Sequence, residues 1–176
     1  MKYFGDPEKF ALAYQRINDE CFLKVWVHKV EVCGYFKQDD THVYRWNIGE
    51  TVEWLRENLE NILTESDFPL PIKADNSIEF YRESGNFESE DDDEFYQWYD
   101  KRQEWFFRHS WYVSRSGSYL PDIFFRRKDN QIEIQWDNEH LYDGVEFINP
   151  KGIFEIDPET FKNVITNFIE DYIKTV

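Results

Sequence analysis

Two extended segments joined by a short polar turn constrain the fold of this chain more than any other feature. Residues 122–127 and 131–136 flank the turn 128–130, which has the polar composition typical of a hairpin. In the second segment apolar residues starting with Ile132 face one way, and polar residues that include Glu133 face the other. This alternation predicts an antiparallel sheet with one face on the core and the other in water.

Residues 9–17 fit two different secondary structures. Alternate side chains are apolar from Phe10 to Tyr14, as in a strand, but Phe10, Tyr14 and Ile17 also share one face of a helix. The preceding Asp6-Pro7-Glu8 favours a helix start, because Asp can cap a helix and Pro suits its first turn. Periodicity alone therefore leaves this segment open.

Further strands are expected where β-branched and aromatic residues alternate with polar ones. The stretch from residue 22 to 36 is interrupted by a glycine and reads as one bent strand or two paired strands. Shorter extended segments are expected at 43–46, 145–148 and 153–156. These segments add to the same antiparallel architecture.

The clearest helix covers residues 48–64. Asn47 can cap it, and Glu50 three positions later completes the reciprocal capping arrangement. Two prolines within residues 68–71 prevent its continuation. Its apolar residues form a single stripe that faces the core: Val52, Leu55, Leu59 and Ile62.

Two more helices complete the predicted set. Asp157-Pro158-Glu159 begins the C-terminal helix, and acids near residue 93 suit the start of another that runs to about Ser116. The buried stripe of the C-terminal helix is Phe161, Val164 or Ile165, Phe168 and Tyr172. The inward face of the other helix is Tyr96, Tyr99, Trp105 or Phe106, and Trp111. We therefore expect one α+β domain over residues 1–176, a mainly antiparallel sheet packed by two or three helices.

The charge of the chain limits its partners. The sequence has 20 Lys and Arg against 36 Asp and Glu, a net charge of -16, while 19% aromatic residues argue against disorder. Such a charge disfavours approach to phosphate backbones and anionic lipid, so we expect neither direct nucleic-acid binding nor membrane docking. The sequence shows no signal segment, and Cys21 and Cys33 are expected to be free, buried thiols, which predicts a cytoplasmic protein.

The sequence contains no recognisable catalytic motif. The four histidines are scattered, without the Cys or His spacing of a metal site. The serine-rich stretch 114–118 lacks the leading glycine of a nucleophile elbow, and the 7 glycines form no phosphate-binding loop. Cys33 and His28 have opposite parity on a strand, which disfavours a thiol catalyst. We therefore expect no enzymatic activity, no metal site and no cofactor.

An acidic run beside aromatic residues is the most distinctive local feature. Residues 83–100 contain eight acids and no base. Such a run is often only a solvated face. However, Tyr and Trp anchor interfaces, and surrounding acids steer a basic partner into position. The predicted partner-binding residues are Glu90, Asp91, Asp92, Asp93, Glu94, Tyr96, Trp98 and Tyr99.

Several short motifs resemble a known class of proteins. Phe4-Gly5-Asp6-Pro7, followed by the segment from Phe10 to Tyr14, is similar to the amino-terminal pattern of immunity proteins from bacterial polymorphic-toxin and contact-dependent inhibition systems. Similar segments are Trp46-Asn47-Ile48 leading into Trp54-Leu55, Leu120-Pro121-Asp122-Ile123, and the run from Ile132 to Trp136. In that class a Gly-Asp turn leads into an edge strand, so the resemblance favours a strand at residues 9–17.

The resemblance implies a cytosolic antidote that binds a cognate toxin domain, commonly a nuclease, and blocks its active site. Such proteins work by binding and have no catalytic residues to carry over. The expected partner is a cognate protein toxin, and the expected state is a monomer or weak homodimer.

Two other functions remain open at this point. A phage or plasmid protein that mimics DNA against a restriction or defence nuclease would also be strongly acidic, with carboxylates regularly spaced along one face. An enzyme would need a deep cleft, built here from the aromatic cluster and containing perturbed acids.

Overall fold

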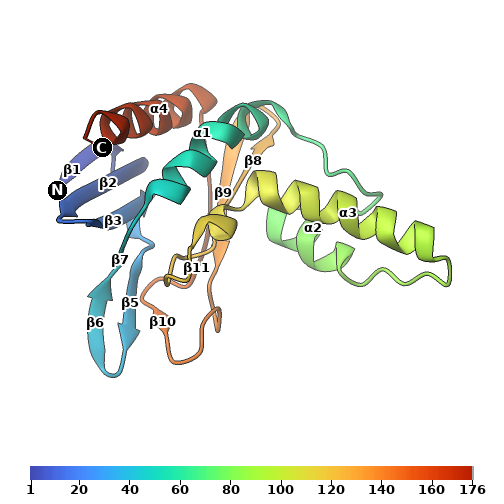
Figure 1. Ribbon diagram of the computed structural model, residues 1–176. Coiled ribbons are helices and arrows are strands. Elements are labelled where there is room, and N and C mark those ends of the chain that lie inside the picture. Colours follow the sequence, from blue (N-terminus) through green and yellow to red (C-terminus); the bar gives the residue numbers. More distant parts are fainter. Residues whose placement is uncertain (176) are drawn as a thin grey trace.

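The computed structural model describes residues 1–175, which form four α-helices and three antiparallel sheets (Figure 1). The predicted α+β class is confirmed, although the strands divide into three sheets. None of the helices in residues 1–175 is long and apolar enough to cross a membrane.

The N-terminal sheet settles the ambiguous segment as a strand. Phe10–Ile17 forms β2 and pairs on both sides, with β1 and with β3. Its inward residues pack against the C-terminal helix, as in the edge-to-face contact of Tyr14 and Phe168. The other strands of this sheet are β1 (Lys2–Asp6), β3 (Glu20–Val27), β4 (Val30–Glu31) and β7 (Arg45–Trp46).

The turn implied by the resemblance lies elsewhere. Gly5 and Asp6 form the end of β1, which is itself the edge strand, and the chain turns at residues 7–9. Gly5 has a φ of +95°, and a Cβ there would lie 2.6 Å from Val164 Cγ2. The glycine is therefore needed because the C-terminal helix packs directly onto this strand.

A small second sheet lies beside the first. β5 (Gly34–Lys37) pairs with β6 (Asp40–Val43) on one side and with β10 (Glu146–Phe147) on the other. The expected strand at 22–36 is thus divided among β3, β4 and β5. Cys21 and Cys33 are free and buried, as predicted.

The third sheet contains the predicted hairpin. β8 (Phe124–Lys128) and β9 (Gln131–Asp137) pair around the turn, and β11 (Lys151–Ile156) pairs with the other edge of β9. The expectation that the polar face of β9 is in water holds for Gln131, which is exposed, but is wrong at Glu133. Glu133 on that face has 0% exposure, because the unexpected helix α2 (Ser77–Ser84) covers it.

Two long helices cover the sheets. α1 (Gly49–Thr64) and α4 (Pro158–Thr175) pack against each other above the first and third sheets (Figure 1). The predicted stripes of both helices are buried, with Leu59 partly buried. The capping arrangement predicted at Asn47 does not form: Ile48 occupies the cap position, and Asn47 Oδ1 accepts only from Gly49 N.

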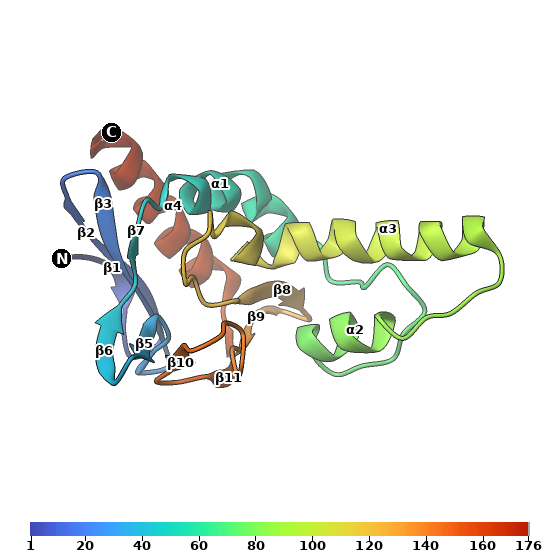
Figure 2. The same ribbon diagram turned by 60° about the horizontal axis from the view of Figure 1, so that its bottom comes forward.

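The third long helix leaves the body of the protein. α3 (Asp92–His109) ends seven residues before the expected Ser116, because Ser110 adopts an extended backbone and a 3-10 turn, Trp111–Ser114, follows. Figure 2 shows α3 and α2 extending together away from the sheets. A second core of Ile78, Trp105, Phe106 and Phe124 joins this arm to the body.

One close contact in the third sheet gives a stability prediction. Gly152 lies opposite Trp136, and a Cβ at Gly152 would be 2.2 Å from the Trp136 ring. The ring has nowhere to move, because it is 3% exposed and its Nε1 donates to Asn149 O. We expect Gly152→Ala to lower the free energy of unfolding by about 1–3 kcal/mol through overpacking.

Urea denaturation measures this effect. Ile153→Val is the control, because Ile153 is 52% exposed on the same strand, and it should change stability by less than about 0.5 kcal/mol. Equal stability of the Gly152→Ala variant and the unchanged protein would show that the ring does not occupy this position.

Candidate functional site

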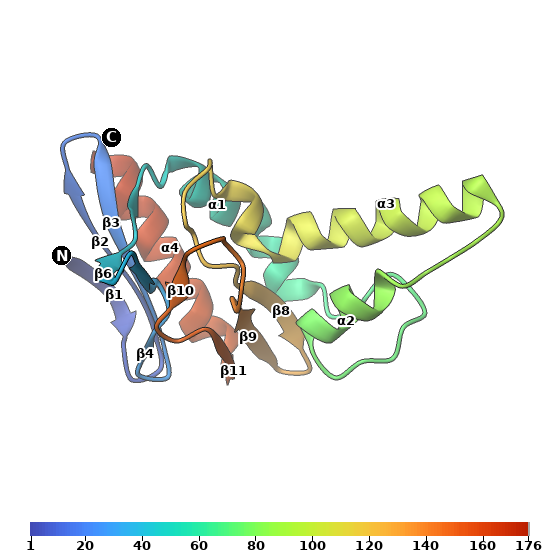
Figure 3. The same cartoon turned by 90° about the horizontal axis from the view of Figure 1, so that it is seen from below.

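The predicted partner-binding residues lie at the free end of a helical arm. The helical arm consists of α2, the connection 85–91 and α3, and Figure 3 shows the N-terminal end of α3 far from the three sheets. Its acidic tip comprises Glu88, Glu90, Asp91, Asp92, Asp93 and Glu94, all of which are exposed. The arm therefore holds these side chains where a partner reaches them without touching the body.

The acids of the tip also order the start of α3. Asp91 caps the helix, since its Oδ1 accepts from Asp93 N at 2.9 Å and from Glu94 N at 3.1 Å. Ser89 Oγ donates to the Glu94 carboxylate at 2.6 Å. Acids in the first turn also match the positive end of the helix dipole. The tip is therefore a structured turn, and some of its acids stabilise the start of α3.

Two of the three predicted aromatic residues have internal contacts. Trp98 stacks on Phe87 with ring centroids 4.0 Å apart, and its Nε1 donates to Ser84 O at 2.8 Å. The Tyr99 hydroxyl lies 2.8 Å from Gly85 O. These contacts fasten the connection between α2 and α3 to the side of α3. Trp98 and Tyr99 thus hold the connection against α3 and keep only part of their surface in water.

Tyr96 has a different position from the one its spacing indicated. It is 64% exposed, so its predicted place on the inward face of the helix is wrong. Phe95, which is not among the predicted partner-binding residues, is 38% exposed, and its ring centroid lies 5.8 Å from that of Tyr96. The apolar surface next to the acids is therefore formed by two neighbouring rings. Their adjacency to the acidic run was the signal that could have identified Phe95.

The charge of the acidic tip is not neutralised by the protein itself. Within residues 1–175, none of its six carboxylates takes part in a salt bridge. The first bases along α3 are Lys101 and Arg102, and Arg102 is bound to Tyr81 O at the base of the arm. The tip thus presents uncompensated negative charge around two exposed rings. This arrangement can bind a positively charged surface.

Within residues 1–175, a buried histidine joins the ends of two helices. Residues 1–175 contain no group of three or more His, Cys, Asp or Glu placed to hold a metal ion. His109 is buried, with Nδ1 2.8 Å from Phe125 O and Nε2 3.2 Å from Glu65 Oε2. Hydrogen bonds from His109 and Arg108 lower the pKa of Glu65 to about 2. This group joins the end of α1 to the end of α3.

Comparison with known proteins identifies a family. A model described as "Family of unknown function (DUF5984)" matches residues 27–175. The chain belongs to this family. No curated protein and no solved structure matches the chain. The DUF5984 match includes the whole helical arm and begins near the end of β3, so both the tip and the core that supports it lie within the family region.

Proposed function

We propose that this chain is an immunity protein that binds and neutralises a basic bacterial toxin domain, such as a nuclease, through the acidic tip. The observation that carries the proposal is a set of six exposed carboxylates without salt-bridge partners within residues 1–175, displayed with Phe95 and Tyr96 on a projecting arm. The function is binding and needs no catalytic group. The protein would act in the cytoplasm as a monomer or weak homodimer.

The arm suits occlusion of an active site. A nuclease binds phosphate with basic residues in a cleft, and a narrow acidic projection complements such a cleft in shape and charge. Uncompensated charge speeds encounter by about 10- to 1,000-fold at low salt, which suits an antidote that must reach its toxin quickly. Exposed aromatic rings then supply apolar contacts that slow dissociation.

The alternative of DNA mimicry has less support. A mimic needs carboxylates spaced along a face, whereas the acids here gather at one end of α3, and Lys101, Arg102 and Arg108 follow along the helix. Enzymatic activity is also less supported, because the aromatic residues of the arm are stacked on one another or exposed.

A charge-removal variant tests the acidic tip. We expect Asp92→Asn, Asp93→Asn and Glu94→Gln together to slow association with the toxin about tenfold at low salt and to flatten its salt dependence. Asp91 is left unchanged because its side chain caps α3. The partner is first captured from the source strain and identified, and association rates are then measured at two salt concentrations alongside rescue of toxin-expressing cells.

A matched control separates local charge from net charge. Glu50→Gln, Glu57→Gln and Glu60→Gln together remove the same number of charges from exposed positions of α1. This control should associate at nearly the rate of the unchanged protein. If both triple variants slow association equally, overall charge and not the acidic tip governs capture, and the proposed interface is wrong.

A further inference from the structure

The chain enters and leaves the helical arm at neighbouring points, and one cluster of side chains links the two. Glu65 follows the last residue of α1, on the way to α2, and His109 is the last residue of α3. Arg108 donates to the Glu65 carboxylate from Nη2 at 2.7 Å and from Nε at 3.0 Å. Glu65 Oε2 also lies 3.2 Å from His109 Nε2. These three residues, the arm clasp, therefore hold the outgoing segment against the returning one.

His109 has acceptors on both sides of its ring. Nδ1 lies 2.8 Å from Phe125 O, and a main-chain carbonyl oxygen only accepts hydrogen bonds. Nε2 faces the Glu65 carboxylate, which is ionised because hydrogen bonds from His109 and Arg108 lower its pKa to about 2. An ionised carboxylate also only accepts. Both contacts are hydrogen bonds only when both ring nitrogens carry a proton, which makes the ring a cation.

Burial keeps water from replacing a missing proton at this ring. His109 is 0% exposed, whereas His28, His42 and His140 are all exposed. With one proton fewer, the lone pair of Nε2 would face the carboxylate oxygen at 3.2 Å, a separation that leaves no room for a water molecule. Two acceptors in contact at a buried site are costly, because neither has a donor. The geometry therefore requires the second proton.

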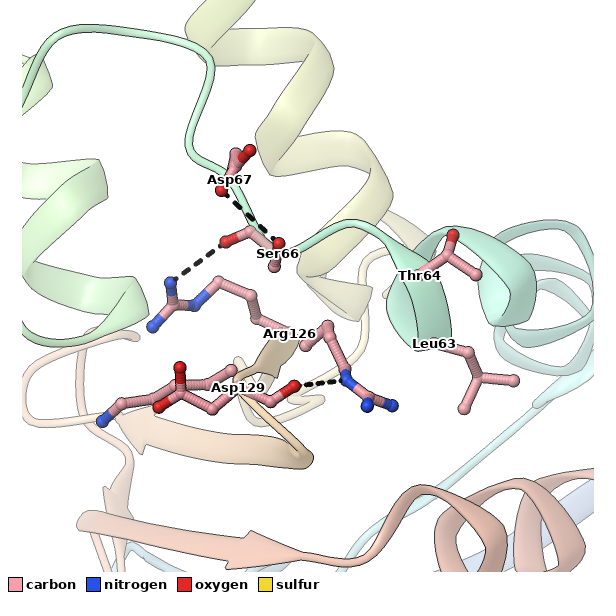
Figure 4. A pocket seen from close by; sticks show the side chains of 8 residues that line it. Leu63, Thr64, Ser66, Asp67, Arg126 and Asp129 are labelled. Atoms are coloured by element: carbon pink, nitrogen blue, oxygen red, sulfur yellow. Dashed lines mark hydrogen bonds between the residues drawn. The ribbon is translucent and has the colours of Figure 1, made fainter.

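The charged groups around the ring come from three elements. The end of α1 contributes Glu65, and α3 itself contributes Arg108, on which the nearby charge of Glu104 also acts. From β8 comes Arg126, whose Nη1 lies 3.5 Å from the carbonyl oxygen of Ser66, the residue after Glu65 (Figure 4). Arg126 is paired with a buried carboxylate of β9. Glu65 is thus the carboxylate that balances the positive charge of the arm clasp.

We propose that the arm clasp is a proton-dependent fastening, in which His109 is an imidazolium and loss of its Nε2 proton releases the end of α3 from Glu65. In the unfolded chain a histidine releases this proton at a pKa of about 6.5. The folded clasp keeps the proton, so folding takes up a proton. The stability that the clasp contributes is therefore full below about pH 6.5 and is lost at a higher pH. The proposal concerns the attachment of the arm and does not depend on what the acidic tip binds.

Nitrogen-15 NMR of the histidine rings tests the charge of His109. At about pH 8 a histidine in an unstructured peptide has one protonated ring nitrogen. His109, assigned as the signal that disappears in the His109→Gln variant, should instead have a proton on both ring nitrogens. A single protonated nitrogen in His109 of the unchanged protein would overturn the proposal.

The variant Glu65→Gln tests the fastening. The amide keeps the shape of the carboxylate without its charge, so His109 should lose its second proton at about pH 8, a change that altered packing alone would not cause. Exchange of the α3 amide hydrogens should become about tenfold faster than in the unchanged protein at the same pH, and equally so in His109→Gln, which lacks the positive charge.

Glu53→Gln is the matched control for Glu65→Gln. It removes the carboxylate partner of an exposed arginine on the same helix α1, and it should change neither the His109 protons nor the exchange of α3. The proposal is also overturned if Glu65→Gln keeps both ring protons on His109, or if its α3 amides exchange as slowly as those of the unchanged protein.

Discussion

Replacing Glu133 by alanine should lower the free energy of unfolding by about 3–5 kcal/mol, because it leaves buried positive charge without its partner. Glu133 is fully buried on β9. Its Oε1 accepts from Ser77 N at 2.9 Å and from Ser77 Oγ at 2.6 Å, which attaches the first turn of α2 to the sheet. Its Oε2 lies 3.3 Å from Arg126 and 3.6 Å from Lys128. One side chain thus joins α2, β8 and β9.

A neighbouring residue provides the control for this prediction. Gln135 lies two positions along the same face of β9, where its Oε1 accepts from Ile78 N and its Nε2 donates to Asn76. Gln135→Ala removes neutral hydrogen bonds from the same helix and should cost only about 1–2 kcal/mol. Both variants are compared by urea denaturation. Equal losses would mean that the charge of Glu133 has no special role in holding the helical arm.

We expect the free energy of unfolding to fall as the pH rises from about 4 to 7, because Asp122 is buried. Burial raises the pKa of Asp122 to about 7, and a hydrogen bond from Ser110 only partly offsets this. In that range the unfolded chain has released the proton of Asp122 while the folded chain keeps it, so folding binds a proton and stability falls with pH. The shift corresponds to at most about 4 kcal/mol, and to less where water reaches the carboxyl group.

The variant Asp122→Asn isolates this effect. The amide resembles the protonated acid in shape and does not titrate, and the hydrogen bond from Asp122 N to Asn138 Oδ1 is retained. We expect the variant to lose the Asp122 part of the decline and to be more stable than the unchanged protein at pH 8, while the two differ least near pH 4. Unfolding free energies measured from pH 4 to 8 test this expectation. Parallel pH profiles would show that Asp122 is ionised in the folded protein.

Local patterns predicted most of the regular elements. The turn between β8 and β9, the stripe of α1 and the cap and stripe of α4 depend on residues close in sequence, and all are present in the structure. Capping signals were less reliable. The pair Asn47 and Glu50 resembled a cap that does not form, whereas Asn76 caps the unpredicted α2 by accepting from Glu79 N. Such signals show where a helix can start, and packing decides whether it does.

The candidate site was only partly accessible to sequence reasoning. The acidic run and its exposure followed from the concentration of charge, because isolated carboxylates are costly to bury. The sequence did not indicate which of the aromatic residues have internal contacts and which are exposed. Trp98 and Tyr99 contact the connection 85–91, while Tyr96 has no such partner and stays exposed. Whether an aromatic residue of α3 is covered therefore depends on where α2 and the connection 85–91 pack against the helix.

The sequence by itself determined the α+β class, the long helices α1 and α4, the β8–β9 hairpin and the strongly acidic surface, since each depends on periodicity or composition. Tertiary structure alone decided that β2 is a strand, that Glu133 is buried and that the acids stand on an arm. Periodicity shows which side chains share a face. What covers that face depends on distant segments, and here α2 covers the polar face of β9 and leaves the end of α3 free.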